Sequence, residues 1–345
     1  MPAVRKDRSA VAAVVASALG IMMTVPSVAR AADDFGNESQ NPRENTSGDK
    51  SGNDISASAM AIHFDQSRNG KGGGAGPVTP AGDWTPPPCW YQPKWTAKQF
   101  KAYTEPIWEA GSTGYEWDAA QRKRYEGGEP YKDFNLDKQD EGYWWDAVAN
   151  PDRIAEPAAL SCDKPTFWVD KGDPPNVPNA VTPEILGQLA YDRIRVPDTE
   201  VKLSPDARQT VNLPTWAWLD ETAFKPVSVT ASIDALGISA TTTATPVSLR
   251  LDPGTEDAEL HPASGECPIE DGRIGTPYTK GQGDRTPPCG LTYLRASQDG
   301  PFPFKATLTW KISWEGSDGQ GGDLPDGTFG TTTEVTVQEA QAVNR

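Results

Sequence analysis

The side chains of this chain that could carry out chemistry are few in kind. Only two histidines occur, His63 and His261, and they lie far apart in the sequence. A Ser-His-Asp or Cys-His mechanism needs an imidazole base and would have to use His261, while a histidine-rich zinc site has no ligands to draw on. No GxSxG elbow, HExxH helix or dinucleotide-binding fingerprint is recognisable either. We therefore expect no catalytic residues, no metal and no cofactor.

Carboxylates are the one reactive group in good supply, with 48 Asp and Glu residues. Glu141 and Asp146 flank Tyr143-Trp144-Trp145, an arrangement that a sugar-cleaving cleft could use, because most glycosidases work with a pair of carboxyl groups. In so acidic a chain such neighbours also arise by chance, and spacing in sequence does not set the separation of two carboxyl groups in space. A catalytic pair is therefore the less favoured interpretation.

A second group of acids lies in a Gly-rich stretch near the C-terminus. Asp318, Asp323 and Asp326 offer the oxygen ligands that Ca²⁺ prefers, and hard cations are common outside cells. Their spacing does not match the twelve-residue calcium loop. A solvated hairpin loop is the favoured interpretation.

Tryptophan is the most unusual feature of the composition. Eight of the twelve tryptophans fall between Trp84 and Trp168. Large aromatic side chains often replace a bigger core in a small disulfide-linked domain, although flat rings also suit sugar stacking. We favour core packing for most of them. Trp144 and Trp145 are adjacent and cannot share one face of a helix or strand, so one should be exposed or at an interface. This pair is our candidate ligand contact.

The N-terminus predicts export from the cytoplasm. Arg5, Lys6 and Arg8 precede an apolar run from about residue 10 to residue 25, and Ala29-Arg30-Ala31 follows. The small residues Ala29 and Ala31 stand at the two positions that a signal peptidase requires, which predicts a signal peptide with cleavage after Ala31. The formal net charge of −16 disfavours nucleic acid and anionic membrane as partners. We expect a secreted, extracellular protein with no membrane segment after signal cleavage.

Four cysteines follow the predicted signal peptide and allow three disulfide connectivities. Each half of the chain holds one pair, so Cys89–Cys162 and Cys267–Cys289 are favoured because each domain could then oxidise alone. On the chain-entropy model the shorter loop contributes about 3 kcal/mol and the longer about 4 kcal/mol. A metal site is the rival interpretation, but no CxxC pair exists and neither histidine is near a cysteine.

The chain divides into four segments. Residues 1–31 are the signal peptide, and residues 32–83 are polar and Gly-rich, which predicts a disordered linker with order beginning near Trp84. Residues 84–197 form a Trp-rich domain with three helices: one that starts from a capping box at Thr96, one over residues 115–125, and one that starts at Thr182 and stops before Pro197.

Residues 198–345 show the period-two alternation of β-strands. Seven or eight short strands without intervening helices predict an immunoglobulin-like β-sandwich, so the whole chain is mainly β with a smaller α-containing part. The strand with Trp216 and Trp218 sits where the composition changes. We expect both indoles to be largely buried at the junction of the two halves, with Pro214 at a strand edge or bulge. The alternating strands are expected at residues 227–235, 238–243, 247–251, 291–296, 304–314 and 335–337.

Several motifs resemble those of a family of secreted actinobacterial (Streptomyces-type) proteins, over about residues 89–341. They are Val211-Asn212-Leu213-Pro214-Thr215-Trp216, Trp310 and Trp314, the closing Val337-Gln338-Glu339-Ala340-Gln341-Ala342, Trp90-Tyr91 and Tyr191-Asp192. Members often carry names such as ATP/GTP-binding protein or enoyl reductase, for which this sequence shows no motif. The family has no assigned activity, so the resemblance implies no site residues.

The C-terminal part is also similar to polycystic-kidney-disease (PKD-like) immunoglobulin-type domains. Their Trp-Asp-x-Gly-Asp-Gly turn corresponds here to Leu249-Arg250-Leu251-Asp252-Pro253-Gly254, which lacks the tryptophan and the second acid. The resemblance implies a sandwich, which the alternation predicts independently.

Together these features predict a secreted, non-enzymatic binding or structural protein at or near the cell envelope. Its partner is expected to be an extracellular protein or a cell-wall glycan. The alternative is a carbohydrate-active enzyme or a polysaccharide-binding accessory protein, because of the aromatic residues and acids between residues 84 and 168. A scaffold for other secreted proteins is a third hypothesis. A cleft holding Trp144 or Trp145 beside two carboxylates would favour the alternative.

Overall fold

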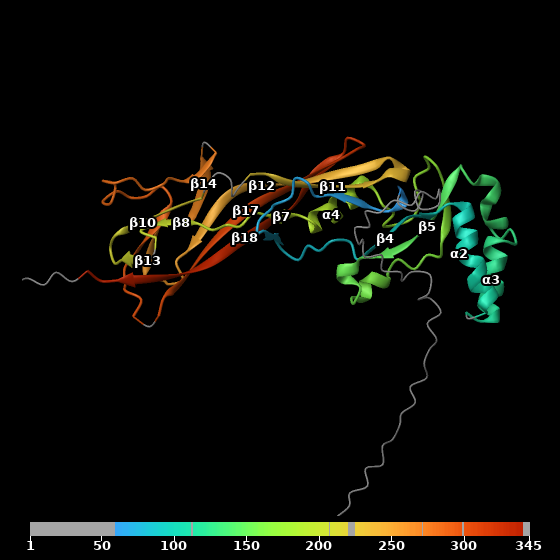
Figure 1. Cartoon of the computed structure of the whole chain (residues 1–345), viewed down its shortest axis with the longest axis horizontal. Coiled ribbons are helices and arrows are strands. Elements are labelled where there is room, and N and C mark those ends of the chain that lie inside the picture. Colours follow the sequence, from blue (N-terminus) through green and yellow to red (C-terminus); the bar gives the residue numbers. More distant parts are fainter. Residues whose placement is uncertain are drawn as a thin grey trace, which may run out of the picture. The chain divides into compact units, whose positions relative to one another are not determined.

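The computed structural model describes residues 59–340, except residues 112, 207, 220–224, 271 and 299 (Figure 1). The predicted signal peptide and the first half of the predicted linker lie outside the described residues. The described part is mainly β, as predicted, with one large antiparallel sheet system and a smaller helical part.

Three α-helices lie where the sequence predicts them. They are α2 (Ala97–Ala110), α3 (Tyr115–Tyr125) and α4 (Pro183–Asp192). The capping box of α2 is present: the Thr96 side chain accepts from the Gln99 backbone, and the Gln99 side chain accepts from the Thr96 backbone at 2.9 Å. Pro106 lies inside α2 without ending it, and Gly111 closes the helix in the left-handed conformation. Short 3-10 turns are η1 (Asp133–Lys138), η2 (Pro151–Arg153), η3 (Pro157–Leu160) and η4 (Asp234–Leu236).

The Trp-rich part is built on a three-stranded antiparallel sheet in the order β4-β5-β6. Its strands are β4 (Cys89–Trp95), β5 (Gly142–Ala149) and β6 (Phe167–Asp170). Helix α2 contacts β4 and β5 and also η1. The central strand β5 is therefore covered on the face that α2 and η1 occupy.

The C-terminal part contains a sheet of long strands in the order β11-β12-β17-β18. They are β11 (Val227–Ile233), β12 (Ile238–Asp252), β17 (Phe302–Gly316) and β18 (Gly321–Gln338). Strand β12 joins two runs that the sequence predicts as separate strands. A register shift between Pro246 and Ser248 leaves Val247 exposed, whereas Leu249 and Leu251 are buried as the alternation predicts.

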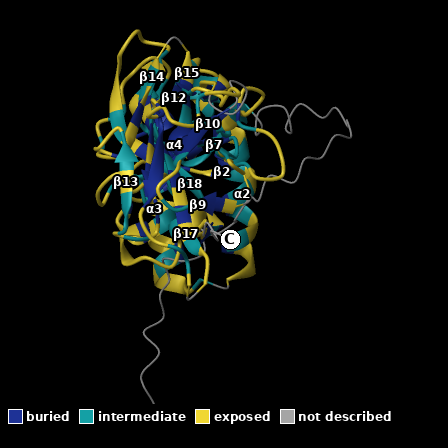
Figure 2. Cartoon of the chain, turned by 90° about the vertical axis from the view of Figure 1, so that its left-hand side faces the viewer, coloured by how far each residue is buried: buried dark blue, intermediate teal, exposed yellow. Residues whose placement is uncertain are grey.

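Shorter strands form the rest of the sheet system. Strand β14 pairs with β12 on one side and with β15 on the other, which connects the long strands to the set β15-β10-β16-β13. The strands are β8 (Lys202–Ser204), β9 (Arg208–Thr210), β10 (Pro214–Leu219), β13 (Ala258–His261), β14 (Glu266–Glu270), β15 (Arg273–Gly275) and β16 (Gly290–Tyr293). Ala217, Leu291, Leu249 and Leu308 share one buried cluster, so strands from both sets line the same core (Figure 2).

Residues 63–80 are ordered, which corrects the prediction that order begins near Trp84. They form β1 (His63–Asp65), β2 (Gly76–Pro77) and β3 (Thr79–Pro80). Strand β1 pairs with β11 and β3 pairs with β18, so this segment covers part of both outer strands of the long sheet. Between them, β2 pairs with β7 (Arg195–Val196). We call residues 63–80 the N-terminal strap.

The strap is held by one buried polar side chain. Asn69 donates to the carbonyl oxygen of Arg193 at 2.8 Å and accepts from the Arg195 amide at 2.7 Å. A mostly polar sequence can therefore be ordered here because it adds main-chain pairs to sheet edges and packs Val78 and Phe64 against the main core.

The two halves of the chain meet at α4. This helix contacts β11, β12 and β17, and its buried side chains Leu186, Leu189 and Ala190 belong to the same core cluster as the long strands. Trp216 and Trp218 do not form that junction, so this prediction is wrong. Their strand β10 pairs with β8, β15 and β16 of the C-terminal half.

Alternation explains the error. Ala217 and Leu219 point toward the core cluster, so Trp216 and Trp218 point to the opposite face of β10. Trp216 is buried there against the ring of Tyr278, 6.0 Å between centroids, and Trp218 is only half-buried. Pro214 is the first residue of the strand, a position where a missing amide hydrogen is tolerated.

Both predicted disulfides are present, and no cysteine is free. Cys89 is bonded to Cys162 and Cys267 to Cys289, across 73 and 22 positions of sequence. The first connects the start of β4 to the segment before β6, and the second connects β14 to the start of β16.

Candidate functional site

The pair predicted as a ligand contact is buried. Trp144 is 0% and Trp145 is 2% exposed, which contradicts the expectation that one of them is accessible. They do point to opposite faces of β5, but both faces are covered. Trp144 packs with Phe100 and Phe134 of the helical cluster, whereas Trp145 belongs to the larger core cluster on the other side.

Trp144 is the centre of an aromatic cluster. Its Nε1 donates to the carbonyl oxygen of Phe134 at 3.1 Å. Its ring lies 4.6 Å from that of Phe100, 4.7 Å from that of Tyr131 and 5.5 Å from that of Trp168, measured between centroids. For Trp144 the core-packing interpretation is therefore correct.

Of the two neighbours of this pair on β6, Phe167 is buried and Trp168 is partly exposed. Trp168 lies opposite Trp144 in the strand register, and Phe167 lies opposite Trp145. Trp168 is half-buried, and its indole contacts Trp144 edge to face at 74°. Trp144 therefore supports the partly exposed Trp168, whereas Trp145 packs against the buried Phe167 on the other face.

Tyrosine hydroxyls occupy the outer edge of β6. The Tyr125 hydroxyl donates to the Thr166 carbonyl oxygen at 2.9 Å, and the Trp168 amide donates to the Tyr131 hydroxyl at 3.3 Å. Burial raises the pKa of Tyr125 to about 12, so this hydroxyl stays protonated. The main-chain groups at the free edge of β6, with which another strand could pair, are thus partly hydrogen-bonded within the chain.

An open groove of about 310 Å³ lies at this edge. Asp170 is fixed in it: its Oδ1 accepts from Trp168 Nε1 at 2.6 Å and is 3.5 Å from Lys138 Nζ. The Lys164 ammonium lies 4.3 Å from the centroid of the Phe167 ring. The groove is lined by Tyr131, Lys164, Phe167, Trp168, Val169, Asp170, Asp173, Pro174, Pro175 and Asn176.

Trp168 and Asp170 are not among the site residues predicted from the sequence, although their spacing is a signal, because residues two positions apart in a strand share a face. In Phe167-Trp168-Val169-Asp170 the burial alternates strictly, with the tryptophan and the aspartate on the same face of a short strand. What could not be read was that this strand lies at the edge of its sheet.

Glu141 and Asp146 do not form a catalytic pair. Asp146 is 5% exposed, accepts from the Thr166 hydroxyl at 3.1 Å and lies 3.5 Å from Lys94 Nζ. Burial raises the pKa of Asp146, and the Lys94 charge opposes that shift. Glu141 is exposed in the turn just before β5, whereas Asp146 is buried within the strand and is already bonded to Thr166 and Lys94. Asp146 has a structural role.

The Asp318, Asp323 and Asp326 group is spread along a hairpin. Asp318 accepts from the Gln320 amide in the turn, while Asp323 lies on β18 beside Lys311, 3.3 Å from its Nζ. Within the described residues no group of three or more His, Cys, Asp or Glu side chains could hold a metal ion. His261, on β13, is 3.1 Å from the Thr292 hydroxyl through its Nε2.

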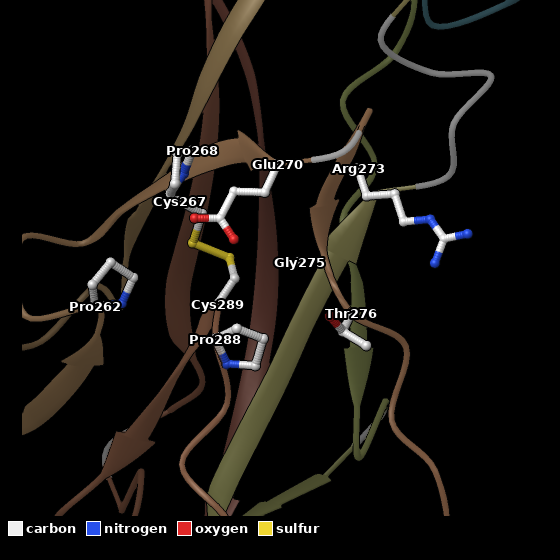
Figure 3. A pocket seen from close by; sticks show the side chains of 9 residues that line it. All are labelled: Pro262, Cys267, Pro268, Glu270, Arg273, Gly275, Thr276, Pro288 and Cys289. Carbon is white, nitrogen blue, oxygen red and sulfur yellow. A yellow bond between two sulfur atoms is a disulfide. The ribbon is translucent and has the colours of Figure 1, made fainter.

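A second cleft, of about 650 Å³, lies beside the Cys267–Cys289 disulfide (Figure 3). Its lining includes Pro262, Pro268 and Pro288. In Figure 3 the Glu270 side chain points toward the disulfide and that of Arg273 points away from it. Both side chains are exposed. The β6 groove is the better candidate, because its polar and aromatic groups are held by hydrogen bonds and packing.

Within the described part of the chain, no helix is both long and apolar enough to cross a lipid bilayer. Two disulfides are consistent with an extracellular protein. Comparison of the chain with protein-family models, with curated proteins and with solved structures finds no match.

Proposed function

We propose that this chain is a secreted, non-enzymatic protein that binds a component of the cell envelope or its surroundings in the β6 groove. The observation that carries the proposal is the fixed pair of Trp168 and Asp170. The indole is held by the Trp144 ring and by its hydrogen bond to Asp170, so a ligand meets a surface that is already ordered. Such preorganisation is what a binding site needs.

Secretion is part of this proposal. It rests on the basic start, apolar run and Ala29-Arg30-Ala31 of the N-terminus, and the two disulfides support it. The resemblance of the sequence motifs to secreted actinobacterial proteins points to the same location, although no family model, curated protein or solved structure matches the chain.

The runner-up is a carbohydrate-active enzyme. The observation that favours it is that the groove contains two carboxylates, Asp170 and Asp173. Reducing-sugar release from polysaccharides would reveal hydrolysis, and the double variant Asp170→Asn/Asp173→Asn should abolish that release. If the wild-type chain releases no sugar from any polymer that it binds, the non-enzymatic proposal stands.

Binding is tested with the mature chain, residues 32–345, immobilised and exposed to cell-wall fractions and culture supernatant. We expect retention of a component that Trp168→Ala no longer retains. The matched control is Tyr115→Ala, which removes an aromatic ring that is 89% exposed and lies outside the groove. Equal retention by wild type and a folded Trp168→Ala variant would reject the β6 groove as the binding site.

A further inference from the structure

The β6 groove has features that select one class of ligand. We propose that it binds a neutral polysaccharide, with one sugar ring stacked on Trp168 and hydroxyl groups bonded to Asp170 and Asn176. This inference rests on the proposed function, because it names the chemical class of the ligand for the same groove.

The stacking surface is Trp168. Its indole is half-buried and is fixed on two sides, by the Trp144 ring at 5.5 Å and by Asp170 Oδ1 at 2.6 Å. One face of a pyranose ring presents mainly C–H groups, and a flat aromatic surface can cover these without leaving a polar group unpaired. Because the indole is already held in place, stacking costs little side-chain entropy.

Two polar side chains lie where ring hydroxyls need partners. Asp170 Oδ1 is occupied by Trp168 Nε1, which leaves Oδ2 to accept a charge-assisted hydrogen bond. Asn176, which also lines the groove, offers an amide that both donates and accepts. A sugar hydroxyl can donate to the Asp170 carboxylate and can donate to or accept from the Asn176 amide. It therefore matches these two side chains better than a ligand that only donates or only accepts hydrogen bonds.

The charges of the groove favour a neutral ligand. Asp170 and Asp173 are balanced by Lys164, which lines the groove, and by Lys138, whose Nζ is 3.5 Å from Asp170. In a chain of net charge −16 such a local balance sets this groove apart from the acidic average. A cationic or anionic polymer would therefore meet as much repulsion as attraction here.

The size and openness of the groove favour a polymer over a small molecule. Its volume of about 310 Å³ is at the lower end of the range for small-molecule pockets, and it is open rather than enclosed. A chain of sugars can lie across such a groove with one ring over Trp168 and the neighbouring rings in solvent.

Affinity electrophoresis of the mature chain tests the inference. The gels contain laminarin, hydroxyethyl cellulose, arabinoxylan or galactomannan as neutral polymers, and polygalacturonate or glycol chitosan as charged ones. We expect at least one neutral polymer to retard the wild type more than it retards Trp168→Ala. The charged polymers should retard both proteins equally, because a chain of net charge −16 interacts with them through its overall charge. Trp168→Ala should weaken the binding about tenfold, as the loss of roughly 1.4 kcal/mol predicts, whereas Tyr115→Ala should leave it unchanged.

Two further variants protect the test against misfolding. Trp168→Phe keeps an aromatic ring but loses area and the bond to Asp170, and Asp170→Asn keeps an acceptor for Trp168 Nε1 while removing the charge. Both should weaken binding with unchanged near-UV circular dichroism. The glycan inference is overturned if no neutral polymer retards the wild type, or if these folded variants bind as well as it does.

The outcomes separate this inference from the proposed function. If the groove retains a protein in a Trp168-dependent way and no polysaccharide is bound, the binding role of the groove stands and the glycan class is wrong. If Trp168→Ala changes the retention of neither proteins nor polymers, both proposals fail together.

Discussion

The Thr242 hydroxyl on β12 donates to the main-chain carbonyl oxygen of Gly187 in α4 at 2.7 Å, and both residues are buried. This bond crosses the junction between the Trp-rich part and the long sheet. Gly187 suits the position because a Cβ there would lie 3.1 Å from Trp314 on β17, closer than side chains normally approach. At Gly187 the helix therefore packs against the sheet through its backbone, while its neighbouring side chains fill the core.

The first prediction concerns this hydrogen bond. Thr242→Val keeps the shape of the side chain and removes the donor, so we expect the free energy of unfolding to fall by about 1 kcal/mol. Thr243→Val is the matched control, because Thr243 is the next residue of β12 and is half-exposed on the outer face. Urea unfolding of both variants measures the difference, and equal stabilities would show that the bond contributes nothing.

The second prediction concerns the two adjacent tryptophans. Trp144→Phe removes the indole that donates to Phe134, and a buried carbonyl oxygen without its partner costs about 1–3 kcal/mol in addition to the lost volume. Trp145→Phe is the matched control. It makes the same change in size on the other face of β5 and leaves the bond between Trp144 and Phe134 in place. We expect Trp144→Phe to be the more destabilising of the two in thermal and urea unfolding. The reverse order would contradict the assigned role of that bond.

The third prediction concerns pH. Burial raises the pKa of Asp146, so in the acidic range above the usual pKa of an aspartate the folded chain binds more protons than the unfolded one. This group therefore contributes stability at low pH that is lost as the pH rises through the raised pKa. The Asp146→Asn variant has no carboxyl group to ionise at this position. The free energy of unfolding of the variant, relative to that of the wild type, should therefore increase with pH across this range.

Urea unfolding at a series of pH values measures the effect of Asp146. The difference between the two proteins isolates this one group, because every other carboxyl group is common to both. Asn keeps an oxygen that can accept from Thr166, so the variant should remain folded. A difference in stability that does not change with pH would contradict the prediction.

The fourth prediction concerns the N-terminal strap, residues 63–80. A chain that starts at Ala81 lacks β1 and β3, so the outer edges of β11 and β18 lose the pairs that these two strands provide. We expect this truncated chain to self-associate in sedimentation velocity experiments. Asn69→Ala should loosen the strap and speed up amide exchange of β1 and β2 in the full chain, because it removes the bonds to Arg193 and Arg195. If the truncated chain is monomeric, the strap is not needed to prevent association through the edges of β11 and β18.

Much of the local structure could be predicted from the sequence. Thr96 and Gln99 fix the start of α2 through a capping box, and Thr182 followed by Pro183 fixes the start of α4. The alternation over residues 304–314 predicts β17, and the placement of one cysteine pair in each half predicts both disulfides. These features depend on near neighbours in sequence or on a small number of alternatives.

Tertiary structure decided which faces are covered. Adjacent Trp144 and Trp145 point in opposite directions, as the sequence requires, but only the packing of α2 on one face and the main core on the other buries both. In the same way, pairing with sheet edges gives order to a polar strap that has no core of its own. The sequence predicts a contact site on β5, whereas the structure places the exposed candidates, Trp168 and Asp170, on β6. Exposure depends on whether a strand is central or at the edge of its sheet, and local sequence does not encode the order of the strands.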